Sequence, residues 1–323
     1  MCKKILIYNS GGGLGDSIQL FSLILSIKNH FKKCELYYLT SHDNHFEGKL
    51  NEYGINLKPL KLKIKYFGFR WWHIFFTKRN FLKCNIDKFD LIIDTQSKLR
   101  NTLILKNIPH TNFYSSTYNF RYCTFKNYYI KKKNIVDMIL TNLSIFLDTK
   151  IKKVNYDLIN IPKKILDEAK KLLPNNSYVG FSITQGNSYR KKNWPIAKII
   201  LLANRVKLKG KVPVFFVSKT NYEIVDAIKE KVPSALFPEH NSKLTCPALV
   251  TALSTRLDCA VSIDNGIMHM MSLANLPLIV LFGPTNSEKF APTKDNIVIL
   301  DSNIIYKSND ISKIGVEEVL RNI

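Results

Sequence analysis

The order of short apolar runs at the start of the chain limits the folds that it can adopt. Residues 5–8 (I-L-I-Y) form one such run, and the glycine-rich turn N-S-G-G-G-L-G-D follows directly at residues 9–16. From residue 17 onward apolar side chains recur at helical spacing, and residues 35–39 (E-L-Y-Y-L) form a second apolar run. This order predicts a strand, a turn, a helix and a strand, which is the β-α-β unit of a parallel sheet.

A second series of the same kind occupies the C-terminal half. We expect strands at residues 178–183, 212–217, 259–263 and 278–282, and helices at residues 164–173, 195–206, 222–231 and 247–255. A chain of 323 residues is long enough for two cores, and Pro162 interrupts the pattern between the two series. The sequence therefore predicts two Rossmann-like, doubly wound α/β domains, residues 1–160 and 161–323, whose last helix either stays in the second domain or packs back on the first.

Composition narrows the class of protein. Hydrophobic residues make up 46% of the chain and charged residues 23%, which is typical of a globular protein. No run approaches the ~18 apolar residues of a membrane span, and residues 5–8 are too short for the apolar part of a signal peptide. The six cysteines form no C-x-x-C pair and no metal-ligand spacing. We therefore expect a cytoplasmic protein, at most peripheral on a membrane, with no metal site.

The net charge of +23 favours anionic partners such as nucleic acid, phosphorylated substrates or an anionic membrane. Residues 1–150 hold 24 Lys and Arg against 10 Asp and Glu, a net charge of +14. Coding bias toward Lys, Asn and Ile explains the total equally well. Residues 58–83 combine eight cations with eight aromatic residues, which suits an anionic membrane surface, a nucleic acid, or a partly buried segment with its lysines outward.

Asp16 decides which ligands the glycine turn suits. Gly11, Gly13 and Gly15 do not form the dinucleotide fingerprint G-x-G-x-x-G, because the carboxylate at position 16 would repel a pyrophosphate. No Gly-Lys-Ser/Thr ends the turn, so it is not a Walker A loop either. An Asp at a helix N-terminus often caps the helix. Capping and a general base at the mouth of a cleft are both open interpretations of this residue.

Polar side chains also follow the other predicted strands, where ligands of doubly wound sheets bind. Asp94 and Gln96 follow the apolar run at residues 91–93. The segment 184–195, T-Q-G-N-S-Y-R-K-K-N-W-P, suits a diphosphate at a helix start, or is a solvated basic loop anchored by its Trp. The segment 264–269, D-N-G-I-M-H, either caps a helix beside a buried His or contributes to a phosphate or sugar pocket.

Taken together, these motifs resemble those of the heptosyltransferase family, glycosyltransferase family nine, along nearly the whole chain. D-N-G-I-M-H at residues 264–269, followed by Pro277 and F-G-P-T at residues 282–285, is similar to the family signature D-[TS]-G-x-x-H…P…[YF]-G-P-T. Three shorter matches complete the set: K-N-W-P at residues 192–195 with K-x-W-P, G-D at residues 15–16 with S-x-G-D, and D-T-Q at residues 94–96 with D-x-Q.

The resemblance implies a GT-B fold, in which an N-terminal acceptor domain and a C-terminal nucleotide-sugar domain face a central cleft. It implies an inverting enzyme that moves heptose, or a related sugar, from an ADP-sugar to a lipopolysaccharide core acceptor, without a metal or other cofactor. The charge of residues 1–150 and the segment 58–83 fit an anionic acceptor of this kind at the inner membrane face. Asp16 would be the general base, and Lys192 would offset charge on the leaving diphosphate. The implied donor-binding residues are Thr184, Gln185, Ser188, Lys192, Glu223, Asp264, Asn265, Gly266 and His269, and the implied acceptor-binding residues are Gly13, Gly15, Asp94 and Gln96.

The chain departs from the family pattern in two places. Asn265 stands where the family has Thr or Ser, and the loop at residues 184–192 is a few residues longer than in some members. Two other functions stay open. One is an NAD-dependent oxidoreductase on the same double-Rossmann plan, which Asp16 disfavours, and the other is a non-catalytic nucleic-acid-binding protein, which only the charge supports.

Overall fold

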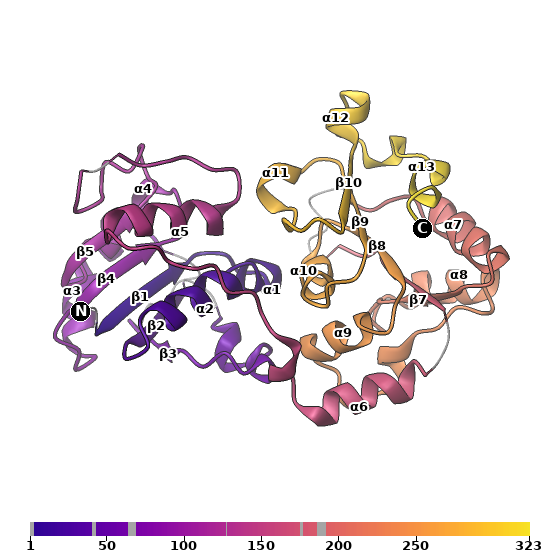
Figure 1. The fold of residues 1–323 in the computed structure, drawn as a ribbon, viewed down its shortest axis with the longest axis horizontal. Coiled ribbons are helices and arrows are strands. Elements are labelled where there is room, and N and C mark those ends of the chain that lie inside the picture. The colour runs from indigo at the N-terminus through magenta and orange to yellow at the C-terminus, as the bar shows by residue number, and fades with distance from the viewer. Residues whose placement is uncertain (1–2, 41–42, 64–68, 127, 175–176, 186–191) are drawn as a thin grey trace. The chain divides into compact units, whose positions relative to one another are not determined.

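The chain forms two compact units, each built on one parallel sheet (Figure 1). The computed structural model describes residues 3–40, 43–63, 69–126, 128–174, 177–185 and 192–323. The first unit comprises Met1–Asn51 and Ile55–Tyr156, and the second comprises Glu52–Gly54 and Asp157–Ile323. The chain thus passes finally into the second unit at residue 157, against an expected boundary at residue 161, and three early residues belong to the second unit.

The first sheet has the strand order β3-β2-β1-β4-β5, and all its neighbouring strands are parallel. Its strands are β1 (Lys4–Asn9), β2 (Glu35–Thr40), β3 (Lys58–Pro59), β4 (Phe89–Asp94) and β5 (His110–Ser115). The middle of the central strand β1 is apolar because helices cover both faces of such a sheet, and Ile5, Leu6, Ile7 and Tyr8 are fully buried.

Five α-helices are described in the first unit: α1 (Leu14–Ile18), α2 (Phe21–His30), α3 (His73–Leu82), α4 (Leu99–Leu105) and α5 (Ile135–Phe146). The helix expected from residue 17 begins earlier, inside the glycine turn, because Asp16 at the third helical position accepts a hydrogen bond from the N–H of Gly13. The same segment then divides into α1 and α2 at Gln19 and Leu20.

The second sheet has the order β10-β9-β8-β6-β7, and its pairs are again parallel. Its strands are β6 (Tyr178–Ser182), β7 (Val212–Phe215), β8 (Cys259–Ile263), β9 (Leu278–Phe282) and β10 (Ile297–Asp301). The predicted α/β class is confirmed. The sequence did not predict the short strand β3 or the edge strands β5 and β10, whose burial is incomplete.

The helices described in the second unit are α6 (Lys163–Leu172), α7 (Ile196–Leu208), α8 (Tyr222–Lys231), α9 (Pro247–Ser254), α10 (Gly266–Leu273), α11 (Ser287–Phe290), α12 (Ser302–Tyr306) and α13 (Val316–Leu320). The last helix, α13, packs on α7, and Val316 and Val319 are buried in the core of this unit. Trp194 Nε1 donates to the carbonyl oxygen of Ile314 at 3.1 Å, which ties the start of α7 to the chain before α13. No helix among the described residues is long and apolar enough to cross a membrane.

Tyr53 explains why residues 52–54 belong to the second unit. Its side chain is fully buried, and its hydroxyl lies 2.8 Å from the carbonyl oxygen of Pro247 and 2.7 Å from Thr251 Oγ1. Glu52 lies 3.8 Å from the ammonium group of Lys164. A buried tyrosine hydroxyl needs such partners, so this short segment is held by α9 rather than by its neighbours in sequence.

Candidate active site

The side chains predicted from the sequence lie at the carboxyl ends of strands in both units. In the first unit they follow β1 and β4, and in the second they follow β6 and β8 or, for Glu223, begin the helix after β7. Ser188 and the basic residues 190–191 lie outside the described residues. Each unit therefore presents its polar groups where doubly wound sheets bind ligands.

Gly11 and Asp16 are in direct contact within the glycine turn. A Cβ atom on Gly11 would lie 2.8 Å from Asp16 Oδ2 and closer still to the rest of that side chain. A Cβ atom on Gly13 would lie 3.2 Å from the same oxygen, which also accepts a hydrogen bond from the N–H of Gly13 at 3.2 Å. The bare turn is therefore explained by the half-buried carboxylate that it surrounds, and a side chain at position 11 would displace Asp16.

Asp16 caps α1, and capping does not exclude a general base at this position. One carboxylate oxygen caps the first turn of α1, and the contact with Gly11 limits how far the side chain can move. Gly15 is buried inside α1 and its carbonyl oxygen accepts from the N–H of Gln19 at 2.9 Å, whereas Gly13 is exposed.

Asn9, the last residue of β1, holds the glycine turn through hydrogen bonds of its side chain, and the sequence did not predict this role. Its side chain is 2% exposed. Its Oδ1 accepts from the N–H of Gly11 at 2.9 Å and from Gln96 Nε2 at 3.1 Å. Its Nδ2 donates to the hydroxyl of Tyr38 at 3.1 Å and to the carbonyl oxygen of Asp16 at 3.4 Å. An amide directly between an apolar strand and a glycine turn is the signal that could have identified it.

His45 supports the other side of the turn. It lies in a short 3-10 helix (His45–Glu47) after β2, and its Nε2 is 3.0 Å from the carbonyl oxygen of Gly12. The contact needs Nε2 to carry a proton, since the carbonyl oxygen can only accept. The turn is thus held at Gly11, Gly12 and Gly13 by three different side chains.

Asp94 is buried beneath this site rather than exposed in it. Its carboxylate accepts from Thr102 Oγ1 at 2.7 Å, Ser115 Oγ at 2.8 Å and the N–H of Gln96 at 2.9 Å. Burial raises the pKa of Asp94 to about 6, although these three hydrogen bonds act in the opposite direction. Only 1% of Asp94 is exposed. Asp94 is connected to the glycine turn through Gln96, whose main-chain N–H donates to its carboxylate and whose side chain donates to Asn9.

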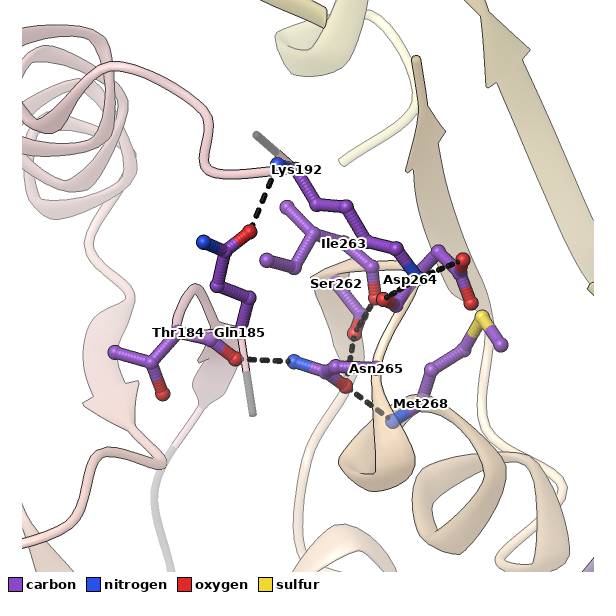
Figure 2. A network of polar contacts seen from close by, with 8 residues as sticks. All are labelled: Thr184, Gln185, Lys192, Ser262, Ile263, Asp264, Asn265 and Met268. Atoms are coloured by element: carbon purple, nitrogen blue, oxygen red, sulfur yellow. Dashed lines mark hydrogen bonds and ion pairs between the residues drawn. The ribbon is translucent and has the colours of Figure 1, made fainter. Parts of the chain in front are cut away.

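In the second unit, Lys192 and Asp264 form an ion pair at the carboxyl edge of the sheet (Figure 2). The two side chains are 13% and 10% exposed, and Lys192 Nζ also lies 3.2 Å from the carbonyl oxygen of Asp264. The N–H of Lys192 donates to Gln185 Oε1 at 2.8 Å, so Gln185 holds the main chain that carries the cation. The carboxylate of Asp264 neutralises the charge that an anionic ligand would use.

Asn265 links two strand ends, which explains its departure from the family pattern. Its Oδ1 accepts from the N–H of Met268 at 2.9 Å and caps α10, while its Nδ2 donates to the carbonyl oxygen of Thr184 at 3.0 Å (Figure 2). The same Nδ2 also donates to Ser182 Oγ at 2.8 Å. A Thr or Ser hydroxyl has a single proton and a shorter reach, so it could not make all three contacts. The amide therefore has a structural role between β6 and α10.

The remaining predicted donor residues differ in exposure. Gly266 begins α10, and His269 on the same helix is buried, with the hydroxyl of Ser272 donating to its carbonyl oxygen at 2.7 Å. Glu223 is exposed in the first turn of α8. Thr285 is buried after β9, and its Oγ1 has no hydrogen-bond partner among the described residues. Thr285 was not among the predicted site residues, although its motif was recognised.

No group of three His, Cys, Asp or Glu side chains among the described residues is arranged to hold a metal ion. The five described cysteines are free thiols. Burial raises the pKa of Cys259, which is typical of an unreactive core thiol.

Comparisons with known proteins give a consistent result. The family model of glycosyltransferase family 9 (heptosyltransferase) matches residues 82–319. Lipopolysaccharide heptosyltransferase 1 of Campylobacter coli is 22% identical over 296 residues, which cover 86% of this chain and 83% of that protein. Lipooligosaccharide heptosyltransferase 2 of Haemophilus influenzae is 27% identical over 111 residues, 34% of this chain and 32% of that protein.

Among solved structures, the glycosyl transferase family 9 protein of Veillonella parvula matches with a TM-score of 0.73 at 18% identity, over 99% of this chain and 96% of that chain. The heptosyltransferase WaaC of E. coli, solved with ADP-2-deoxy-2-fluoro heptose, matches with a TM-score of 0.68 at 14% identity, over 98% of each chain.

The two doubly wound parallel sheets and these structural neighbours define the GT-B fold. The family model covers most of the sequence, and the chain belongs to glycosyltransferase family 9, the heptosyltransferase family. The predicted fold class and family are confirmed, and membership decides against the oxidoreductase and the non-catalytic nucleic-acid-binding protein. The matched region begins at residue 82 and does not include the glycine turn at residues 9–16. The family match therefore assigns no role to that turn, and only its own geometry does.

Proposed function

We propose that this enzyme transfers heptose, or a related sugar, from an ADP-sugar to a lipopolysaccharide core acceptor with inversion at the anomeric carbon. Both curated relatives are named as heptosyltransferases of lipopolysaccharide or lipooligosaccharide. The observation that carries the proposal is the contact of Gly11 with Asp16, because it fixes a carboxylate at the carboxyl edge of the first sheet. A fixed carboxylate in an exposed turn suits a general base.

In the proposed reaction, Asp16 takes the proton of the acceptor hydroxyl as that oxygen attacks the anomeric carbon. A new carbon–oxygen bond forms while the bond from the anomeric carbon to the diphosphate breaks, and ADP leaves with the electron pair. Attack opposite the leaving group inverts the configuration. Gly13 and Gln96 are the predicted acceptor contacts that are not buried.

The second unit would bind the donor. Lys192 would offset the charge that grows on the diphosphate, so the proposal needs no metal ion or other cofactor. Thr184, Gln185, Glu223, Asp264, Asn265, Gly266 and His269 are the described residues proposed to surround the donor. The diphosphate would compete with Asp264 for Lys192, since both anions need the same ammonium group.

The proposed acceptor is anionic and lipid-linked, which suits the net charge of +14 on residues 1–150. We propose that the enzyme works at the inner face of the cytoplasmic membrane as a peripheral protein, with no nucleic-acid partner.

Calorimetry with ADP, UDP, GDP and NAD, without added metal, tests the donor class. Selective binding of ADP supports an ADP-sugar, whereas selective binding of UDP or GDP would contradict it.

The base is tested by Asp16→Asn, which we expect to keep ADP affinity and to lose transfer by a factor on the order of 10²–10⁴. Near-normal turnover by this variant would exclude Asp16 as the base.

A further inference from the structure

Helix α3 of the first unit (Figure 1) and the residues that flank it carry an unusual set of exposed side chains. The exposed fractions are 52% for Trp71, 46% for Trp72, 79% for Phe75, 50% for Phe76 and 64% for Leu82. Arg70, Lys78, Arg79 and Lys83 are exposed among them. Large apolar side chains this exposed usually mark a binding surface when they are contiguous. We call these nine residues the α3 outer face.

The opposite side of α3 is fixed to the core of the first unit. His73, Thr77 and Phe81 are buried at a spacing of four residues, and Phe81 contacts Phe89 of β4 with ring centroids 5.8 Å apart. His73 Nδ1 accepts from the N–H of Arg70 at 3.0 Å, which also fixes the entry to the helix. The outer face therefore lies on the side of the helix that faces away from these core contacts.

Helical spacing places eight of the nine outer side chains, all except Arg70, in two adjacent stripes. One stripe runs through Trp71, Phe75, Lys78 and Leu82, and the other runs through Trp72, Phe76, Arg79 and Lys83. In both stripes aromatic residues lie at the start and cations toward the end. Aromatic rings beside Lys and Arg are the composition of helices that lie in the headgroup region of a bilayer.

We propose that the α3 outer face docks the first unit onto an anionic lipid bilayer. The rings of Trp71, Trp72, Phe75 and Phe76 would enter the headgroup region, and the cations would contact lipid phosphates. Charge complementarity carries the choice of partner: α3 contains no acidic residue, and the described residues give Lys78, Arg79 and Lys83 no acidic partner. A second protein chain would require acidic groups facing these cations, and a self-complementary dimer would bring the cations together.

This inference rests on the proposed function, because an enzyme with a lipid-linked acceptor must bind at the surface of the membrane that holds the acceptor. Its test needs neither donor nor acceptor. The chain has three tryptophans, and Trp194 is 3% exposed in the second unit, so Trp71 and Trp72 should dominate any change in tryptophan emission on binding.

The experiment measures flotation and tryptophan emission of the whole protein with vesicles of phosphatidylcholine alone and of phosphatidylcholine mixed with phosphatidylglycerol. We expect binding and a blue shift only with the mixed vesicles, and weaker binding at higher salt. Lys78→Gln and Arg79→Gln should each lower partitioning roughly fivefold. Phe75→Ser should also lower it, without a loss of stability, because its ring contributes to the surface and not to the core.

Leu208→Ser is the matched control, since this side chain is 81% exposed on α7 in the second unit. It should bind vesicles like the unaltered protein. Equal binding to neutral and mixed vesicles, or unchanged binding by the Phe75, Lys78 and Arg79 variants, would overturn the proposal. The proposal would also be overturned if single-stranded DNA, and not mixed vesicles, covered the α3 outer face, or if a second copy of the chain covered it.

Asp16→Asn separates this inference from the proposed function. If that variant loses transfer and still binds mixed vesicles, both proposals stand. If it keeps transfer, the assignment of the base fails while the vesicle result still decides the membrane surface.

Discussion

The main chain of Gly11 lies against the side chain of Asp16 so closely that no other residue fits at position 11. A Cβ atom there would be 2.4 Å from the Cβ atom of Asp16 and 2.6 Å from its Cγ. These are rigid parts of the aspartate near its own backbone, so they cannot turn away as the end of a long side chain could.

We therefore expect Gly11→Ala to reduce transfer by a factor on the order of 10², because it moves the proposed base by a large fraction of an ångström or more. Gly13→Ala is the graded comparison, since its Cβ atom would meet only the end of the carboxylate, at 3.2 Å. Steady-state kinetics and thermal unfolding of both variants check this. Wild-type turnover by Gly11→Ala would show that the position of Asp16 does not limit the reaction.

The amide of Asn9 should matter for the rate more than for donor binding. Asn9→Ala removes hydrogen bonds to Gly11, Gln96 and the carbonyl oxygen of Asp16, all in the first unit. We expect kcat to fall roughly tenfold or more while ADP affinity stays unchanged, because a misplaced base lowers only the chemical step.

A double-mutant cycle gives the control for that prediction. Gln96→Ala removes one contact of the same amide, so its effect on kcat should be smaller, and it should not add to the effect of Asn9→Ala. Fully additive effects would mean that the two side chains act on the rate separately.

The ion pair of Lys192 with Asp264 predicts opposite effects of two substitutions on ADP affinity. Lys192→Ala should weaken ADP binding, because it removes the proposed phosphate ligand and leaves Asp264 as an unpaired anion. Asp264→Asn should strengthen ADP binding, because the diphosphate would no longer compete with a carboxylate for the ammonium group of Lys192. Calorimetry at two salt concentrations measures both effects.

Asp258→Asn serves as the control for charge alone. Asp258 lies 3.5 Å from Lys211 in the same unit, in a more exposed pair. Its removal should leave ADP affinity unchanged. Weaker ADP binding by Asp264→Asn would contradict competition between the two anions and would make Asp264 a donor ligand.

The buried carboxylate of Asp94 should make stability depend on pH. Burial raises its pKa from 3.8 to about 6, so between these values the folded state binds more protons than the unfolded state. The free energy of unfolding should therefore fall as pH rises through this window, by an amount on the order of 2–3 kcal/mol, and level off above it.

Denaturant unfolding of the unaltered protein and of Asp94→Asn over this pH range isolates the effect, because other carboxyl groups cancel in the difference. The stability of the unaltered protein relative to the variant should decline with rising pH. A difference that does not change with pH would show that Asp94 titrates alike in the folded and unfolded chain.

The sequence determined the α/β class of both units, most of their inner strands and the edges at which their polar residues lie. Strands of a parallel sheet are covered on both faces, so β1, β4, β6, β8 and β9 appear as continuous apolar runs that can be recognised locally. Asp16, Asp94, Lys192 and Asp264 follow such runs or the turns after them, so their position at strand ends was predictable as well.

Only the tertiary structure decided what each of these residues contacts. Asn9 and Gln96 are 87 residues apart, Lys192 and Asp264 are 72 apart, and Tyr53 reaches Thr251 across 198 residues. Such contacts depend on which distant segments the fold brings side by side, and local periodicity carries no information about that. The burial of Asp94 beneath two hydroxyl groups, and the contact of Gly11 with Asp16, arise from the same cause: packing fixes which atoms share a small volume, whereas sequence spacing fixes only their order along the chain.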